Sequence, residues 1–353
     1  MFILVLNEDN LTESFYPLTF TRDLIDLKAG IFSIKEKWER MAFVQRIDLT
    51  ILCKTEDSQI NARSIPANFI PPATLDLKSF FNDDRNLEEL GFKKVEHLWD
   101  ILSLNGWLIE NDLLLIKDQQ SDKTNARITG TYPVVTGTNV IIEHCTINTT
   151  DGPVFIDDNA HIMDGVMLRG PLSIGKHTVV KMGSTIYGGT TIGPHCIVGG
   201  EIKNTTIQGY SNKAHHGYIG NSFIGEWCNL GAGTSGSNLK NTLGDISVWD
   251  IATSSYSNAG KKAGVFMGDH VKTAINTSFN SGTVIGPCSN VFEFEGLTSK
   301  YIDSFSWGGR SDIKYEIEKL IIEIKRWMQL KNFSLSSDNE EKIRTLYLKR
   351  TKK

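Results

Sequence analysis

Residues 156–198 read IDDNAHIMDGVMLRGPLSIGKHTVVKMGSTIYGGTTIGPHCIV, and every sixth residue in this stretch is a branched aliphatic. An α-helix repeats about every 3.6 residues and a strand about every 2, so neither produces this spacing. A solenoid with three short strands per coil does, because each strand then places one residue inside. The spacing returns further along the chain, and the positions are Ile156, Ile162, Leu168, Ile174, Val180, Ile186, Ile192 and Val198, then Tyr218, Ile224 and Leu230, then Met267, Thr273, Phe279, Ile285 and Val291.

Glycine usage changes abruptly near residue 126. Only Gly30, Gly91 and Gly106 of the 31 glycines precede this point, and the polar stretch 118–125 is typical of a linker. Before it, the apolar runs 2–6 and 49–53 predict strands, and an amphipathic pattern over 26–41 predicts a helix, so an α/β domain is expected.

The C-terminal part predicts two helices. One has Ser311 as its cap and an apolar face, and the other covers about 338–350. The sequence therefore predicts three parts: an α/β domain over 1–125, the solenoid over 126–300, and a helical cap with a basic tail over 301–353. The apolar face of the first helix contains Ile313, Ile317, Leu320, Ile321, Ile324 and Met328.

Composition excludes several classes of protein. The 353 residues are 40% hydrophobic and 22% charged, as in globular chains, and the net charge of -4 gives no field for nucleic acid or an anionic membrane. No apolar run approaches the ~20 residues of a membrane span. The five cysteines are dispersed without a CxxC pair, which favours reduced thiols in the cytoplasm. No metal is expected, because the histidines and cysteines lack ligand spacing.

The six-residue repeat breaks at 203–218, which reads KNTTIQGYSNKAHHGY, and we expect this segment to leave the prism as a functional loop. Residues 219–238 follow as IGNSFIGEWCNLGAGTSGSN. The hexapeptide pattern over about 128–295 resembles the left-handed parallel β-helix family. The two quoted segments resemble the acetyltransferase half of the bifunctional UDP-N-acetylglucosamine pyrophosphorylase/glucosamine-1-phosphate N-acetyltransferase family.

This resemblance implies roles for particular residues. By position in the family motif, His215 is the general base, Lys203 and Tyr218 bind a sugar phosphate, and Asn229 and Asn238 bind the sugar. It also implies acetyl-CoA as the acyl donor, a homotrimer with sites between subunits, and an amino-sugar phosphate or sugar nucleotide as acceptor.

The implied chemistry is reasonable for these residue types. A histidine, with an unperturbed pKa of about 6.5, can take the proton that an attacking amine sheds. A backbone N–H in the Gly231-Ala232-Gly233 turn is a candidate donor to the oxyanion. His216 stands beside His215, and both remain candidates for the base. The polar stretch 268–280 is interpreted as solenoid turns whose Asn and Thr side chains cap backbone groups. The alternative is that it lines the end of a groove that holds the acceptor or the pantetheine chain.

The N-terminal domain resembles sugar-phosphate nucleotidylyltransferases in having a strand at 3–6 and a Pro-Leu-Thr element at 17–19. Its intervening loop, 7–14, reads NEDNLTES and has no glycine. A triphosphate cradle needs glycines and converging N–H groups, and carboxylates there repel a nucleotide. We therefore expect a reduced domain kept as a structural platform, with Arg22 and Asn61 as vestiges of a nucleotide site. Mg²⁺ is expected only if nucleotidylyl transfer is retained.

Three functions fit the sequence. The first is acyl-CoA-dependent N-acetyl transfer to an amino-sugar phosphate or sugar nucleotide. The second is sugar-1-phosphate nucleotidylyl transfer of the UDP- or dTDP-sugar type, with the β-helix as an oligomerising stalk. The third is a non-catalytic scaffold that binds a sugar phosphate.

Overall fold

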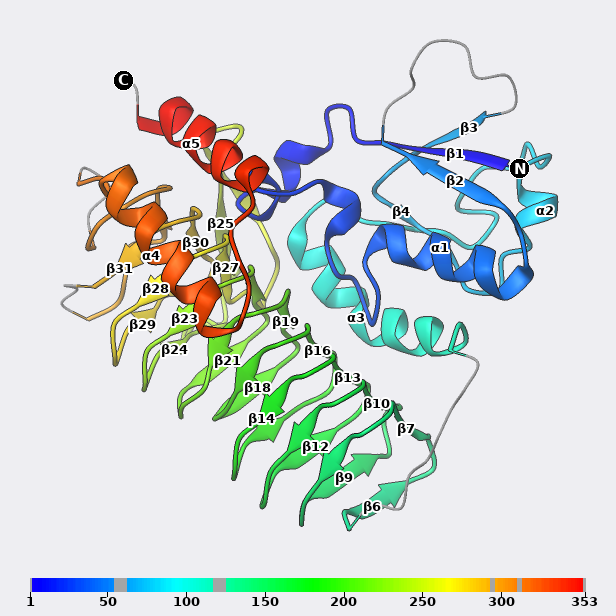
Figure 1. The fold of residues 1–353 in the computed structure, drawn as a ribbon, viewed down its shortest axis with the longest axis horizontal. Coiled ribbons are helices and arrows are strands. Elements are labelled where there is room, and N and C mark those ends of the chain that lie inside the picture. The colour runs from blue at the N-terminus through cyan, green and yellow to red at the C-terminus, as the bar shows by residue number, and fades with distance from the viewer. Residues whose placement is uncertain (1, 54–61, 117–124, 293–295, 310–312, 352–353) are drawn as a thin grey trace.

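The computed structural model describes residues 2–53, 62–116, 125–292, 296–309 and 313–351. A left-handed parallel β-solenoid runs diagonally through the molecule, with an α/β part against one side and two C-terminal helices near its far end (Figure 1). The predicted fold class is therefore confirmed. No helix in these described ranges has the length and apolar character that crossing a bilayer requires.

The solenoid has three parallel sheets, which we call the domain face, the helix face and the open face. The domain face contains β7 (Val134–Thr136), β10 (Val154–Ile156), β13 (Leu172–Ile174), β16 (Thr190–Ile192), β19 (Thr206–Ile207), β22 (Phe223–Ile224), β27 (Val265–Met267), β30 (Thr283–Ile285) and β32 (Tyr301–Ile302). The helix face contains β8 (Ile141–Ile142), β11 (His161–Ile162), β14 (Val179–Val180), β17 (Ile197–Val198), β20 (Asn212–Lys213), β23 (Asn229–Leu230), β28 (Lys272–Thr273) and β31 (Asn290–Val291). The open face contains β6 (Arg127–Gly130), β9 (Thr146–Thr149), β12 (Met167–Arg169), β15 (Thr185–Ile186), β18 (Glu201–Lys203) and β21 (Tyr218–Gly220), and further along the chain β24 (Ser235–Gly236) pairs with β29 (Ser278–Phe279).

Residues of the six-residue repeat fill the interior of the prism. Ile156, Ile174 and Ile192 pair in register on three successive coils, and all three are fully buried. Each fully buried aliphatic side chain stabilises the fold by roughly 1.5–3 kcal/mol relative to an exposed one. Tyr218 is the exception in the predicted set, because it lies half-buried and its neighbour Ile219 takes the buried position.

The predicted excursion at 203–218 is wrong. Strands β18 to β21 continue the three sheets, and the coil is merely shortened: Thr191 pairs with Thr206, fifteen positions on, whereas Thr191 follows its other partner Ser173 by eighteen. A loss of residues at the corners shifts the phase of a repeat just as an insertion does. The true excursion is 239–263, which carries the antiparallel hairpin β25 (Ser247–Asp250) and β26 (Ser255–Asn258).

The N-terminal part is an α/β unit around a parallel sheet of order β2-β1-β3. The strand predictions for 2–6 and 49–53 are confirmed by β1 and β2. The helix predicted over 26–41 begins only at Ile34, because Ser33 and Glu36 form a capping box that starts it there. The elements are β1 (Phe2–Asn7), η1 (Thr12–Phe15), η2 (Leu18–Phe20), η3 (Leu24–Asp26), α1 (Ile34–Gln45), β2 (Leu49–Leu52), β3 (Ala62–Pro66), β4 (Phe69–Ile70), α2 (Leu77–Phe80), β5 (Lys93–Lys94) and α3 (Leu98–Leu113).

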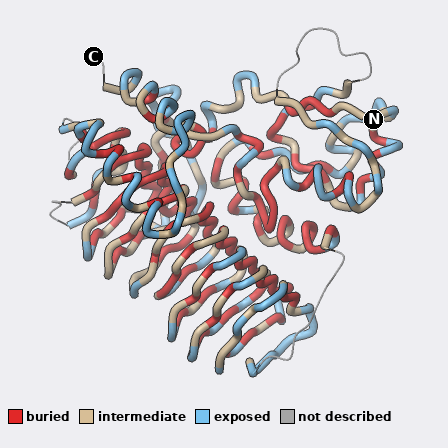
Figure 2. The backbone as a smooth tube through the Cα atoms, viewed as in Figure 1, coloured by how far each residue is buried: buried red, intermediate tan, exposed pale blue. Residues whose placement is uncertain are grey.

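This unit packs on the domain face, where outward apolar residues of the solenoid join its core. Phe155, Phe223 and Phe266 are buried in the same cluster as the N-terminal aliphatics. Buried segments of the solenoid and of the N-terminal part face each other where the two parts meet (Figure 2). Thr191 also donates a hydrogen bond to the carbonyl of Gly30 at 3.0 Å. The predicted linker 118–125 lies outside the described residues except for its last position.

Two helices, α4 (Ile317–Leu330) and α5 (Ser337–Thr351), form a hairpin against the helix face. The predicted apolar face of α4 is confirmed for Leu320, Ile321, Ile324 and Met328, which are buried. Its predicted start is wrong, since the helix begins after Glu316 and Ile313 is exposed, while Ser311 lies outside the described residues. The Lys331 ammonium, between the helices, donates to the carbonyl of His195 at 2.5 Å.

Candidate functional site

Three of the predicted site residues gather on the open face. Strands β18 and β21 are neighbours, so that Lys203 lies opposite Gly220. Tyr218 folds over Gly220, since a Cβ placed there would lie 2.2 Å from the Tyr218 Oη and 2.9 Å from the Asn238 Nδ2. Glycine at this position therefore leaves room for the phenol and the amide side by side.

Hydrogen bonds hold this group in place. Tyr218 and Asn238 share a side-chain hydrogen bond, and the Asn238 Nδ2 donates to the Asn221 Oδ1 at 2.7 Å. Burial raises the pKa of Tyr218, so the phenol stays protonated near neutral pH and offers a hydroxyl donor. The cluster thus presents an ammonium, a phenol and an amide on an accessible sheet.

His215 lies at the 214–217 corner, between β20 on the helix face and β21 on the open face. Its ring is exposed and has no hydrogen-bond partner among the described residues, and its carbonyl accepts from the Lys213 Nζ at 2.5 Å. His216 is also exposed, and its carbonyl accepts from the Gly233 N–H at 3.1 Å. The choice of His215 as base over His216 stays a prediction.

Asn229 does not join the group within one chain. It lies on the helix face in β23, where its Oδ1 accepts from the Asn212 Nδ2 at 3.4 Å and its backbone pairs with Lys272. The 214–217 corner separates that face from the open face. Asn229 therefore lies on one side of this corner. The cluster on the other side consists of Lys203, Tyr218 and Asn238.

The Gly231-Ala232-Gly233 turn forms the corner of the next coil. The Gly231 N–H donates to the backbone and side-chain oxygens of Thr273, and the Gly233 N–H donates to the carbonyl of His216. The Ala232 N–H has no hydrogen-bond partner among the described residues. Of the three predicted oxyanion donors, Ala232 is therefore the one with a free N–H.

Tyr187, which no sequence motif indicates, lies beside Lys203. Tyr187 directly follows β15, and its N–H donates to the carbonyl of Ile202, which places the two side chains on adjacent coils. The Lys203 Nζ lies 5.3 Å from the centroid of the Tyr187 ring, a cation–π contact. Arg169 ends β12, the strand before, and forms an ion pair with Asp151 at 2.6 Å. Arg169, Tyr187 and Lys203 thus lie on successive coils of the open face, and only the strand register reveals this alignment.

Lys213 is a second residue outside the predicted site. It occupies an inward position, opposite the buried Val198, and its side chain is almost fully buried. Desolvation lowers the pKa of Lys213 to about 8. The sequence spacing is consistent with this inward position, because Lys213 stands six residues after Ile207 and six before Ile219, which are both buried.

Arg22, predicted as a vestige of a nucleotide site, forms ion pairs with the solenoid. Its guanidinium contacts the Glu226 Oε1 at 3.0 Å and the Asp269 Oδ2 at 2.5 Å, and Thr21 donates to the same Asp269 oxygen. Burial of Asp269 works to raise its pKa, but the charge and hydrogen bond of Arg22 outweigh this, and the pKa lies below its ordinary value. The charge of Arg22 is thus already compensated. Asn61 lies outside the described residues.

The stretch 268–280 is more than a set of exposed turns. Burial lowers the pKa of His270 to about 3, so its imidazole is neutral. The buried Lys272 Nζ donates to the carbonyl of Trp227 at 2.6 Å and lies 5.0 Å from the Trp327 ring of α4. Lys272 thus caps a backbone carbonyl, as interpreted for the turns of this stretch, and its ammonium also contacts the C-terminal helices.

Comparisons with known proteins agree with this architecture. Residues 4–57 match the family model described as sugar nucleotidyl transferase. The bifunctional protein GlmU of Methanococcus vannielii is 28% identical over 309 residues, covering 87% of this chain and 63% of that protein. GlmU of Methanocaldococcus jannaschii is 32% identical over 53% of this chain and 40% of its own length. A bifunctional sugar-1-phosphate nucleotidylyltransferase/acetyltransferase of Sulfurisphaera tokodaii is 27% identical over 55% of this chain and 43% of its own.

Solved structures show weaker likeness. The polySia-specific acetyltransferase NeuO matches 60% of this chain and 98% of its own at 15% identity, with a TM-score of 0.28. The Arabidopsis UDP-N-acetylglucosamine acyltransferase matches 63% of this chain and 88% of its own at 14% identity, with a TM-score of 0.20.

The fold and the sequence matches together define a hexapeptide-repeat β-helix protein with a sugar-nucleotidyltransferase-like N-terminal segment. The resemblance found in the sequence is confirmed: the chain is similar to bifunctional nucleotidylyltransferase/acetyltransferases over 53–87% of its length. It spans less than two thirds of the length of these three relatives.

Proposed function

We propose that the protein transfers an acetyl group from acetyl-CoA to the amine of an amino-sugar phosphate or sugar nucleotide. The observation that carries this proposal is the cluster of Lys203, Tyr218 and Asn238 on the open face, next to the corner that presents His215. The names of the relatives, which include acetyltransferase activity, support the same reaction class.

The cluster supplies the recognition. The Lys203 ammonium attracts the phosphate of the acceptor, and the hydroxyls of Tyr187 and Tyr218 donate to its oxygens. The Asn238 amide hydrogen-bonds the hydroxyls of the sugar. Asn229, on the other side of the corner, is proposed to contact the sugar held by a neighbouring subunit.

The reaction needs one proton transfer. The amine nitrogen attacks the thioester carbonyl carbon, a C–N bond forms, and the C–S bond breaks as the thiolate leaves. The His215 imidazole accepts the proton that the amine sheds. The Ala232 N–H stabilises the oxygen that becomes negative during attack.

Lysines near the 239–263 excursion offer positive charge for binding the acyl donor, acetyl-CoA. Four lysines lie in or beside the 239–263 excursion: Lys240, Lys261, Lys262 and Lys300, whose Nζ donates to the carbonyl of Ser247 at 3.2 Å. Lys261 is paired with Asp245 at 2.8 Å, and burial and the charge of Lys240 lower the pKa of Lys300. Such a cluster suits the phosphates of acetyl-CoA.

The subunit arrangement that we propose is a homotrimer with the open faces turned toward neighbouring subunits. Met167 on β12 is 51% exposed and Met182 at a corner is 69% exposed, although both are apolar. Exposed apolar side chains of this kind favour a contact surface. A trimer would bring Asn229 of one subunit near the open face of the next.

We propose the same three parts of the chain that the sequence predicts, namely 1–125, 126–300 and 301–353. We take the first part as a structural platform, because the only described residue of its predicted nucleotide site, Arg22, is engaged by Glu226 and Asp269.

Nucleotidylyl transfer with Mg²⁺ is the second candidate function, favoured by the family match over 4–57. Magnesium-dependent pyrophosphate release from a nucleoside triphosphate and a sugar 1-phosphate would establish it.

One experiment tests the main proposal directly. The full chain is incubated with acetyl-CoA and a panel of amino-sugar phosphates and amino-sugar nucleotides, and released thiol is followed with a thiol reagent. We expect thiol release above the background hydrolysis for at least one acceptor. Ligand binding without thiol release for any acceptor would instead identify a non-catalytic scaffold.

A further inference from the structure

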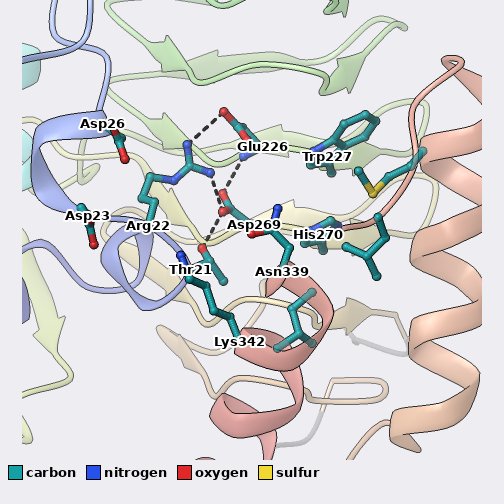
Figure 3. A pocket seen from close by; sticks show the side chains of 13 residues that line it. Thr21, Arg22, Asp23, Asp26, Glu226, Trp227, Asp269, His270, Asn339 and Lys342 are labelled. Carbon is teal, nitrogen blue, oxygen red and sulfur yellow. Dashed lines mark hydrogen bonds and ion pairs between the residues drawn. The ribbon is translucent and has the colours of Figure 1, made fainter. Parts of the chain in front are cut away.

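A cavity of about 310 Å³ lies where the three parts of the chain meet, away from the open face. One side is the segment around Arg22, a second side is formed by two solenoid corners that carry Glu226 and His270, and a third is the start of α5 with Asn339 and Lys342 (Figure 3). Its volume falls at the lower end of small-molecule sites, which span about 300–1,000 Å³. A monosaccharide is therefore a ligand of suitable size.

Two buried polar atoms at this cavity lack partners. The Arg22 Nε and the His270 Nδ1 have no hydrogen bond among the described residues, and His270 is only 9% exposed. Nearly all buried polar atoms in proteins are paired. Since both side chains line the cavity, a ligand inside it can pair with them.

The charges around the cavity select against anions. Four carboxylates line it, those of Asp23, Asp26, Glu226 and Asp269, against the two cations Arg22 and Lys342. Arg22 is occupied by Glu226 and Asp269, whereas Asp23 and Asp26 form no ion pair with any described residue. A phosphate or nucleotide would meet net repulsion here, and an ammonium would meet two unpaired carboxylates.

We propose that this cavity binds an unphosphorylated amino sugar, a second ligand site distinct from the acyl-transfer site. The sugar ammonium pairs with Asp23 and Asp26 at the mouth. Its hydroxyls hydrogen-bond to the Arg22 Nε, the His270 Nδ1 and the Asn339 amide. The apolar rim of Trp227, Met328 and Ile343 contacts its carbon face. Because the cavity spans all three parts of the chain, an occupant ties them together.

Calorimetric titration of the full chain tests this proposal with D-glucosamine as the probe and N-acetyl-D-glucosamine as its uncharged counterpart. We expect saturable binding of glucosamine, and at least tenfold weaker binding of the N-acetyl sugar because it lacks the ammonium. The double variant D23N/D26N should weaken glucosamine binding at least tenfold. Both carboxylates are exposed, so circular dichroism should show this variant folded.

Two controls separate this site from the open face. Asp84→Asn removes an exposed carboxylate elsewhere in the N-terminal part, and Lys203→Ala disables the proposed acceptor site. Both should bind glucosamine as the wild type does. The proposal is overturned if glucosamine does not bind, if the N-acetyl sugar binds equally well, or if K203A weakens binding while D23N/D26N does not.

Discussion

The Lys213 ammonium, inside the prism, donates a hydrogen bond to the backbone carbonyl of His215 at 2.5 Å. A buried cation thus fixes the corner on which the proposed base stands. This inward lysine differs from its neighbours in the stack. The equivalent positions on the adjacent coils are occupied by the aliphatic residues Val198 and Leu230. The arrangement links the stability of one coil to the geometry of its corner.

The first prediction concerns the cost of burying that charge. The pKa of Lys213 is lowered to about 8 from an ordinary 10.5. The penalty is therefore complete below pH 8 and disappears as the pH rises toward 10.5, because the unfolded chain then binds more protons than the folded one. Lys213→Met should raise the free energy of unfolding at pH 7 by about 2–3 kcal/mol.

Urea denaturation of the wild type and K213M at pH 7 and pH 9.5 measures this. The advantage of the variant should shrink at the higher pH. The same variant should lower acyl-transfer turnover by about tenfold, because the His215 carbonyl loses its donor. Full activity in K213M would show that the hydrogen bond does not position the corner.

The second prediction concerns acceptor binding. Lys203→Ala should raise the KM for the phosphorylated acceptor by roughly 10–100-fold, because a charge-assisted contact to phosphate is lost. The turnover number should change much less. Steady-state kinetics, with Lys78→Ala on an exposed site of α2 as the control, separate the two constants. A fall in turnover alone would contradict the phosphate role.

The third prediction uses Gly220 as a spacer. Gly220→Ala places a Cβ about 2.2 Å from the Tyr218 Oη, so the phenol must swing away. The affected atom is the end of a flexible side chain, and the fold should lose little stability. We expect G220A to raise the acceptor KM as Tyr218→Phe does, with no further increase in the double variant. Additive effects would show that the two residues act separately.

The fourth prediction concerns the contact between the N-terminal part and the solenoid. Arg22→Met leaves the buried Asp269 carboxylate without its partner, and such a loss costs about 3–5 kcal/mol. Denaturation should show this loss, and Asp269→Asn in the R22M background should recover part of it. If R22M keeps wild-type stability but abolishes a nucleotidylyl transfer activity, Arg22 serves a nucleotide site instead.

Much of the solenoid could be predicted because its core obeys a strict spacing. The eight positions predicted from Ile156 to Val198 are all buried, whereas Lys213 is out of phase with the predicted repeat, which resumed at Tyr218 instead of Ile219. The 203–218 segment was misinterpreted because a phase shift has the same appearance whether residues are lost or gained. The helix start at Ile34 was missed because the apolar pattern extends upstream of the Ser33 capping box.

The site was harder to predict than the fold. Lys203, Tyr218 and Asn238 came from motif spacing and do lie together on the open face. Tyr187 depends on which residue of the previous coil sits beside Lys203, and a shortened coil makes that register invisible in the sequence. The partners of Arg22 lie more than 200 positions away, so no local pattern could identify them.

The role of His215 as the base is tested most directly by comparing turnover in His215→Ala and His216→Ala under saturating acetyl-CoA and acceptor. We predict that H215A loses at least a hundredfold in turnover while H216A stays within a few-fold of the wild type, since one imidazole takes the amine proton. Gel filtration and acetyl-CoA binding should be unchanged in both variants. Wild-type turnover in H215A would show that His215 is not the base.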